Sequence, residues 1–214
     1  MAQNKYDFTP ALENTSNVHR IELDLIDEGS YVLDVGCHSG LFAAEATARK
    51  HATVVGLDTD EDALNVARTR MSAALAVDIE QQGWTSELIN SGHGPFDRII
   101  FGDVLEHTHE PEMILTEAKK LLRPGGRIIV SIPNVAHWRV RLGLLRGKFT
   151  YTESGILDRT HLRFYTLATG REMIERCGYR ILTQDVAGYS LPHILIRSFP
   201  TLLAIQQVYS AVAV

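Results

Sequence analysis

Short apolar runs alternate with amphipathic segments over the first 133 residues of the chain. Runs rich in Val, Ile and Leu predict strands, and apolar positions recurring at helical spacing predict the segments between them to be helices. The predicted strands are 31–35, 52–58, 73–77, 96–104 and 127–133. The predicted helices are 17–26, 41–50, 59–71, 84–90 and 110–122. This alternation predicts a parallel sheet with helices on both faces.

The pattern changes after Pro133. Residues 134–167 are rich in basic and aromatic side chains and have little periodicity, which predicts a small lid insertion at the acceptor site. A helix at 166–178 and strands at 179–188 and 203–214 complete the predicted elements. The fold class is therefore α/β, with a mostly parallel sheet of seven strands. We expect a single domain over 1–214, in which 1–28 form an N-terminal arm and helix.

Composition narrows the range of partners. Hydrophobic residues make up 45% and charged residues 22% of the 214 positions, as in ordinary soluble domains. The formal net charge of −5 gives no general attraction to nucleic acid or to an anionic membrane. Two cysteines do not make a disulfide framework, and no apolar run approaches the ~18 residues of a membrane span. We therefore expect a cytoplasmic protein with no membrane partner, for which nucleic acid is an unfavoured ligand.

The stretch YVLDVGCHSG, residues 31–40, is the most informative part of the chain. An apolar run stops at Asp34, a loop bounded by Gly36 and Gly40 follows, and an alanine-rich helical segment begins at once. Strand, glycine loop and helix open a βαβ unit in which residues without a Cβ let a ligand approach the backbone. The stretch predicts a cradle for a nucleotide-type cofactor.

Four segments together resemble the class I S-adenosylmethionine-dependent methyltransferases. They are VLDVGCHSG, GLDTD, FDRIIFGDVLEH and LLRPGGRIIVSIPN, in that order, over roughly residues 31–134. The later run GKFTYTESGILDRTHLRFYT is similar to a bacterial branch near the ubiquinone-biosynthesis O-methyltransferases and the methionine-biosynthesis W proteins. The resemblance implies a Rossmann-like fold and S-adenosylmethionine as cofactor. The dinucleotide fingerprint GxGxxG is absent, which disfavours a nicotinamide cofactor.

The resemblance also implies which residues hold the cofactor. Asp34 and the loop would line its methionine end, Asp58 would accept from the ribose hydroxyls, and Asp78 with Ile79 would lie at the adenine. The implied cofactor-binding set is Asp34, Gly36, Cys37, His38, Gly40, Asp58, Thr59, Asp78, Ile79, Gly102 and Asp103. One departure is His38, which replaces the middle glycine of the common GxGxG loop and must keep its side chain clear of the cofactor.

A second cluster contains candidate catalytic and metal-binding residues. Asp103, Glu106, His107 and His161 resemble the ligand set of the small-RNA 2′-O-methyltransferases, with Asp103 in place of a glutamate. Such a set implies a divalent cation such as Mg²⁺, which would lower the pKa of a substrate hydroxyl. His161 alone is an alternative general base, because an imidazole accepts protons near neutral pH. We take His161, His107 and Glu106 as catalytic candidates; the structural alternative is that Glu106 and His107 only fix the loop after the fourth strand.

The basic segment of the lid allows two interpretations. His137 to Lys148 could bind an anionic acceptor. The favoured interpretation is an amphipathic cap helix with Trp138, Leu142 and Leu145 buried and the arginines in water.

The predicted function is S-adenosylmethionine-dependent methylation of a small molecule, on a hydroxyl of a sugar or a secondary metabolite. Two alternatives stay open: a non-catalytic, cofactor-binding partner subunit and an RNA 2′-O-methyltransferase. A homodimer is also open.

Overall fold

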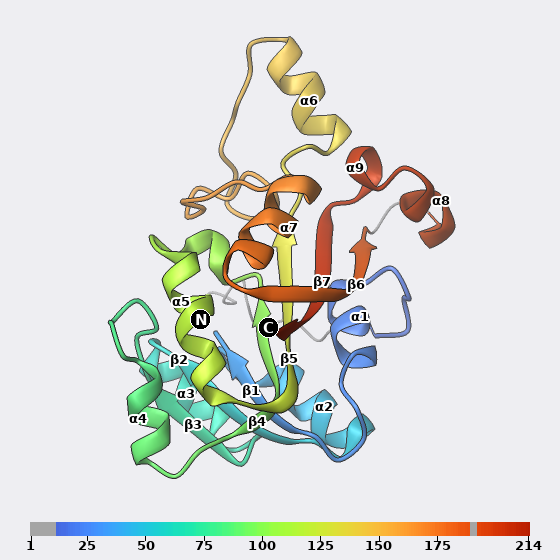
Figure 1. The fold of residues 1–214 in the computed structure, drawn as a ribbon. Coiled ribbons are helices and arrows are strands. Elements are labelled where there is room, and N and C mark those ends of the chain that lie inside the picture. Colours follow the sequence, from blue (N-terminus) through green and yellow to red (C-terminus); the bar gives the residue numbers. More distant parts are fainter. Residues whose placement is uncertain (1–11, 189–191) are drawn as a thin grey trace.

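The computed structural model of the chain describes residues 12–188 and 192–214. Most of the predicted arm, residues 1–11, lies outside the described residues. Seven strands form one sheet in the order β3-β2-β1-β4-β5-β7-β6 (Figure 1). The strands are β1 Tyr31–Val35, β2 Thr53–Asp58, β3 Ala73–Ala76, β4 Phe96–Gly102, β5 Leu122–Pro133, β6 Tyr179–Ala187 and β7 Gln206–Ala213. The α/β class and the seven strands predicted from the sequence are confirmed.

Strands β1 to β5 pair in parallel, and β7 lies antiparallel between β5 and β6, so β7 alone runs against the other strands of the sheet. Consecutive residues of a strand point to opposite faces of the sheet, so Val32 and Leu33 enter different clusters. Helices α1 Val18–Asp24 and α2 Leu41–Lys50 pack around Val32. Helices α5 Pro111–Ala118 and α7 Leu167–Arg176 pack around Leu33 on the other face. Both faces are therefore covered, as a parallel sheet requires.

Local sequence explains most element ends. Asp60 accepts hydrogen bonds from the backbone of Asp62 and Ala63 and so caps α3 Glu61–Ala67. Asn17 caps α1 in the same manner, through His19 N–H. Thr166 and Thr169 form a capping box at the start of α7. The predicted brief helix after Gly83 is α4 Thr85–Asn90.

The strand β5 and the lid helix differ from the prediction. The strand β5 begins at Leu122, before the Pro-Gly-Gly turn, whereas we placed its start at 127. Helix α6 Trp138–Leu145 forms inside the lid, but the predicted burial of three of its side chains is wrong. Trp138 is 39%, Leu142 37% and Leu145 84% exposed, and only Val140 is buried. The lid helix therefore projects from the body and does not cap it (Figure 1).

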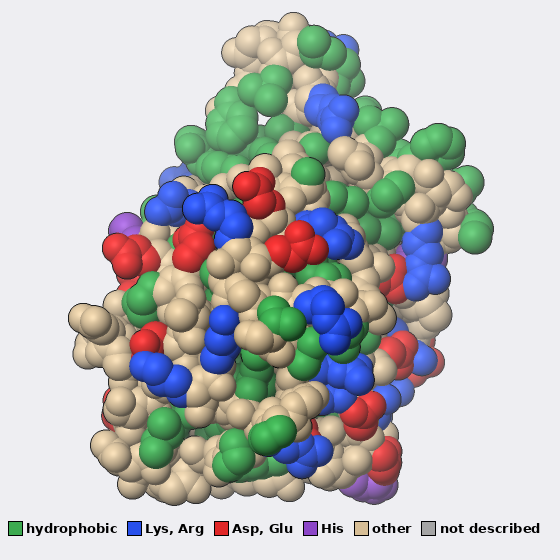
Figure 2. All heavy atoms as spheres, in the orientation of Figure 1, with side chains coloured by type: hydrophobic (Ala, Val, Ile, Leu, Met, Phe, Trp, Pro, Cys, Tyr) green, Lys and Arg blue, Asp and Glu red, His purple; other side chains and the backbone are tan. Residues whose placement is uncertain are grey.

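Two short helices between β6 and β7 had no predicted counterpart. They are α8 His193–Ser198 and α9 Pro200–Leu203. Their outer side chains Ile194, at 72%, and Phe199, at 60% exposure, are largely in solvent. Figure 2 shows hydrophobic side chains gathered at this end of the molecule, over α6, α8 and α9. Among the described residues, no helix combines the length and apolarity that crossing a membrane demands.

Candidate active site

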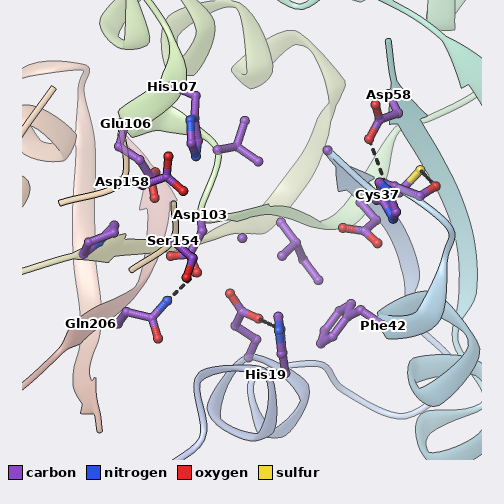
Figure 3. A pocket seen from close by; sticks show the side chains of 18 of the residues that line it. His19, Cys37, Phe42, Asp58, Asp103, Glu106, His107, Ser154, Asp158 and Gln206 are labelled. Carbon is purple, nitrogen blue, oxygen red and sulfur yellow. Dashed lines mark hydrogen bonds and ion pairs between the residues drawn. The ribbon is translucent and has the colours of Figure 1, made fainter. Parts of the chain in front are cut away.

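A cavity of about 700 Å³ opens at the carboxyl ends of β1, β2, β4 and β5 (Figure 3). The strand order reverses between β1 and β4, and such a switch point is where open α/β sheets bind their ligands. Residues from α1, the glycine loop, the loop after β4, the lid and the start of β7 line it together. The cavity thus joins the predicted cofactor cradle and the predicted catalytic cluster in one space.

The glycine loop has no room for a side chain at either end. Gly36 has φ +75°, and a Cβ there would lie 2.6 Å from Val104 Cγ2. Gly40 also has φ +75°, and its Cβ would meet Met71 Cε at 2.8 Å. Side chains at either position would combine an unfavourable backbone conformation with a steric clash. The two glycines therefore set the shape of the cradle.

Asp58 ties this loop to the end of β2. One of its oxygens, Oδ2, accepts the His38 N–H at 2.8 Å, and Oδ1 accepts the N–H groups of Thr59 and Asp60 at 2.8 and 2.9 Å. His38 has φ +45°, the left-handed conformation usual for glycine, and it lines the cavity that it was expected to leave clear. A carboxylate has about four lone-pair sites, so Asp58 keeps capacity for ribose hydroxyls.

Asp34 lies behind the loop and is buried. Its Oδ2 has no hydrogen-bond partner in the part of the chain that the structure describes. Burial first, and then the charge of Glu22, raise the pKa of Asp34 to about 7. A buried carboxyl group without a partner is costly unless a ligand supplies a donor or a cation. Asp34 is thus suited to bind a polar or cationic group in the cavity.

Asp103 follows β4 in a strained conformation, with φ +53°. Its N–H donates to Ser131 Oγ at 3.0 Å, and Ser131 Oγ donates to its Oδ1 at 3.2 Å. The Nε2 of Gln206 donates to the other carboxylate oxygen, Oδ2. Burial, followed by the charge of Glu22, raises the pKa of Asp103 to about 6. These contacts hold the carboxyl group in one orientation against the cavity.

Glu106, His107 and His161 meet at the opposite end of the cavity, with one potential ligand atom from each within 4.8 Å of the others. The two imidazole rings are 4.7 Å apart, edge to face. Glu106 is 1% exposed, and neither carboxylate oxygen has a hydrogen-bond partner among the residues described. Burial and then Asp103 raise the pKa of Glu106 well above its usual range. Asp103, expected as a fourth ligand, does not join this group.

Backbone groups of the lid form hydrogen bonds with this cluster. The carbonyl of Glu106 accepts the N–H groups of Leu162 and Arg163 at 2.8 and 3.0 Å. His107 Nδ1 lies 3.3 Å from the carbonyl of Thr160, and His161 Nδ1 lies 3.2 Å from that of Ile156. A carbonyl only accepts, so Nδ1 is the donor in each ring, and the corresponding neutral tautomer has Nε2 as its acceptor nitrogen.

Some predicted residues lie away from the cavity. Thr59, Asp78, Ile79 and Gly40 are not among its lining residues. Asp78 is exposed and accepts the Glu80 N–H at 2.9 Å. Cys37 does line the cavity, but burial, followed by the charge of Asp34, raises the pKa of its thiol, which disfavours a nucleophilic thiolate.

Other lining residues were not predicted, among them Glu22 and, labelled in Figure 3, His19, Phe42, Asp158 and Gln206. One pattern pointed to Glu22. It lies four residues after Val18 and so falls on the apolar stripe of α1, where a carboxylate is out of place. Asp158 lies in the later run that carries the resemblance to the bacterial branch, and no motif covers His19, Phe42 or Gln206.

Comparison with known proteins agrees with this geometry. A family model described as a methyltransferase domain matches residues 7–184. A ubiquinone biosynthesis O-methyltransferase of Rhizobium johnstonii is 36% identical over 161 residues, covering 71% of this chain and 63% of that protein. One of Acinetobacter baylyi is 35% identical over 124 residues, covering 55% and 52%. The chain spans only 42% of the length of another such relative, from Rhizobium etli.

Solved structures share the fold at low sequence identity. An S-adenosylmethionine-dependent methyltransferase of Mesorhizobium loti has a TM-score of 0.61 at 18% identity, covering 94% of this chain and 99% of that one. Magnesium protoporphyrin IX methyltransferase of Synechocystis, solved with bound SAH, gives 0.60 at 19% identity, with 87% and 75% covered. With the motifs, the strand order and the family model in agreement, the chain belongs to the methyltransferase-domain family of the class I, S-adenosylmethionine-dependent type.

Proposed function

We propose that this protein binds S-adenosylmethionine and transfers its methyl group to a hydroxyl oxygen of a small molecule. One observation carries the proposal: a single cavity joins the glycine cradle and Asp58 to the paired histidines His107 and His161. The fold alone is not enough, because a cyclase, SpnF, has the same fold with a TM-score of 0.60. The activity therefore depends on the residues of the site and not on the fold.

The cavity suits the cofactor. Val104 packs against Gly36 with no room for a Cβ, Asp58 offers an acceptor oxygen for a ribose hydroxyl, and the buried Asp34 offers one for a cationic group. When bound, S-adenosylmethionine supplies an activated methyl group on a sulfonium. The protein then has to align the acceptor and remove its proton, since displacement at carbon needs an in-line approach.

The paired histidines are placed to take that proton. Because Nδ1 of His161 faces the carbonyl of Ile156, its Nε2 is the nitrogen that can accept a hydroxyl proton. His107 is oriented in the same way by Thr160 and stands edge-on to His161. We propose His161 as the general base and His107 as its partner in orienting the hydroxyl.

We further propose, as the alternative to a metal-free base, that Glu106, His107 and His161 hold a divalent cation, in which case the cation and not His161 would activate the hydroxyl. Two imidazoles and one carboxylate suit zinc, iron or cobalt better than Mg²⁺, which prefers oxygen ligands. A cation there would neutralise the buried Glu106 and would lower the pKa of an acceptor hydroxyl. The donor set supports this proposal and argues against Mg²⁺ as the ion.

The lining of the cavity favours a neutral acceptor. Among its described residues there is no Lys or Arg, whereas Glu106 and Asp158 contribute carboxyl groups. A phosphate or carboxylate acceptor would lack a Lys or Arg partner in the cavity, and an RNA strand normally needs a basic face. This supports a neutral acceptor such as a sugar, another polyhydroxy metabolite or a phenol, and the names of the ubiquinone-biosynthesis relatives support oxygen as the methylated atom.

A non-catalytic partner subunit is the second candidate. A structural relative from Haloferax volcanii was solved in a complex with its Trm112 activator, with a TM-score of 0.62 to this chain. The exposed apolar side chains of α6 and α8 would suit such an association. In that case the cofactor pocket would be kept while His161 would be dispensable.

The test has two stages. Calorimetry with S-adenosylmethionine should show one-site binding, and an absence of binding at millimolar ligand would end the proposal. The protein should then release S-adenosylhomocysteine from S-adenosylmethionine when supplied with neutral sugars or catechols. Release with polyhydroxy or phenolic acceptors, and none with phosphorylated ones, is the expected pattern. Methylation of short RNA would overturn the assignment of the acceptor.

A further inference from the structure

A hydroxyl and a carboxylate of the lid stand in a row with His107. The Oγ1 of Thr160 lies 3.1 Å from His107 Nδ1 and donates to Asp158 Oδ1 at 2.7 Å. Asp158 is 4% exposed and lines the cavity close to His107, whereas Thr160 is exposed (Figure 3). Neither of the two lid residues was among the catalytic candidates predicted from the sequence. The row joins the lid to the loop after β4 through side chains.

The carboxylate sets the direction of the hydrogen bonds in this row. A threonine hydroxyl has one proton, and that of Thr160 goes to Asp158, because an ionised carboxylate only accepts. The Thr160 oxygen keeps its lone pairs and therefore accepts from His107 Nδ1–H. The Thr160 carbonyl, 3.3 Å from the same nitrogen, also only accepts. Both groups of Thr160 thus require the proton of His107 on Nδ1 and leave Nε2 as an acceptor.

The turn around Asp158 holds the row in place. Its Oδ1 also accepts the N–H of Thr160 at 2.9 Å, and its carbonyl accepts the N–H of His161 at 3.1 Å. Thr152 forms a β-bridge with Asp158 and so closes the turn from the other side. One aspartate therefore fixes both the residue that contacts His107 and the backbone of the second histidine.

We propose that Asp158 and Thr160 are positioning residues, a carboxylate–hydroxyl relay that keeps the proton of His107 on Nδ1 and presents Nε2 to the acceptor hydroxyl. The part played by that hydroxyl rests on the proposed function, whereas the relay is a property of the ligand-free protein. The relay serves both alternatives for the site, because the same Nε2 would bind the cation, and partners behind a ligating histidine orient it in the same manner.

Thr160→Val tests the relay directly, since it removes the hydroxyl and keeps the β-branched shape at an exposed position. Imidazole nitrogen chemical shifts of the EDTA-treated, ligand-free protein report the tautomer at about pH 8, where an ordinary imidazole is neutral. The signals of His107 are identified by their loss in His107→Gln. In the wild type nearly all of His107 should carry the proton on Nδ1. In Thr160→Val that population should fall, because the nearer of the two Thr160 acceptors is gone.

Turnover with catechol as acceptor gives a second measurement. Thr160→Val should lower kcat by about tenfold or more, the usual cost of losing the partner that orients a functional histidine. The Kd for S-adenosylmethionine should stay within about twofold. Thr160→Ser restores the hydroxyl and should return both the tautomer and kcat to nearly the wild-type values.

Thr152→Val is the matched control. It removes a hydroxyl from the same turn, one that donates to the carbonyl of Ser154 at 2.9 Å. Neither the tautomer of His107 nor kcat should change in this variant. If Thr160→Val does not fold, Thr160→Ala takes its place with the same expected fall in the Nδ1–H population.

Two results would overturn the relay, whatever the protein methylates. One is a wild-type His107 with its proton on Nε2, and the other is a tautomer that is the same in Thr160→Val and in the wild type. If the tautomer responds as expected but the wild type releases no S-adenosylhomocysteine with any acceptor, the relay stands and the proposed function falls.

Discussion

The imidazole rings of His107 and His161 lie 4.7 Å apart, edge to face, although one follows strand β4 and the other belongs to the lid. The backbone of the lid enforces this meeting, because the carbonyl of Glu106 accepts hydrogen bonds from Leu162 and Arg163. A lid bonded to the loop after β4 delivers its histidine to a fixed place, which is what proton transfer requires.

His161→Ala tests the catalytic role of this pair. Removal of a positioned base typically costs about 10²–10⁴ in rate, so turnover should fall by at least about a hundredfold. The Kd for S-adenosylmethionine, measured by calorimetry, should remain within about twofold, since the cradle lies at the other end of the cavity. Turnover near that of the wild type would favour the partner-subunit alternative.

Chelation tests the proposed cation. Exhaustive EDTA treatment should abolish most turnover, and zinc, iron(II) or cobalt should restore it better than Mg²⁺, because two of the three ligands are imidazoles. Elemental analysis of the purified protein should find about one such ion per chain, and His107→Ala should lose it. Full activity after EDTA treatment would remove the cation from the mechanism and leave His161 as a metal-free base.

Gly36→Ala tests the shape of the cradle. The new methyl group would lie 2.6 Å from Val104 Cγ2 at a φ of +75°. We expect a loss of roughly 2–4 kcal/mol in the free energy of unfolding, from backbone strain and overpacking together. Gly29→Ala is the matched control, because its φ is +69° and its Cβ would meet nothing within 4 Å. It should lose only about 1 kcal/mol, and Val104→Ala should partly rescue the Gly36 variant. Equal losses in the two glycine variants would contradict the steric argument.

Asp34→Asn tests the buried carboxyl group through pH. Its pKa is about 7 in the folded protein and about 4 when unfolded, so the folded state holds the proton to a higher pH. The resulting stability is fully present below about pH 4 and is lost as the pH rises to about 7, by at most about 4 kcal/mol. Urea unfolding of the ligand-free protein should therefore show a flatter decline with pH in Asp34→Asn than in the wild type. Parallel pH curves for the two proteins would show that Asp34 titrates normally.

Most of the sheet was predictable from the sequence. Strong apolar runs such as 31–35 and 96–102 can only be buried, and the glycines and caps between them leave little freedom in the boundaries. The burial of the lid side chains could not be predicted in the same way. Whether Trp138 and Leu145 are buried depends on whether another surface lies opposite the helix, and the local sequence does not contain that information. The small helices α8 and α9 are too short to show a helical period.

The candidate site was predictable where a motif fixes it. Asp34, Gly36 and Asp58 follow from the glycine loop and the end of the second strand, and all three line the cavity. Asp78 was carried over from the family pattern, but the turn after β3 leaves it exposed. Gln206 reaches Asp103 only because β7 inserts beside β5, a long-range pairing that a linear pattern does not encode.

That insertion has a consequence for synthesis of the protein. Until β7 arrives, β5 and β6 each present an unpaired edge, and such edges invite association with other chains. The same strand brings Gln206 to Asp103, so the Asp103 side of the cavity is completed only after residues 206–213 have been made. A ligand that contacts this side would then stabilise only chains in which β7 has paired with β5.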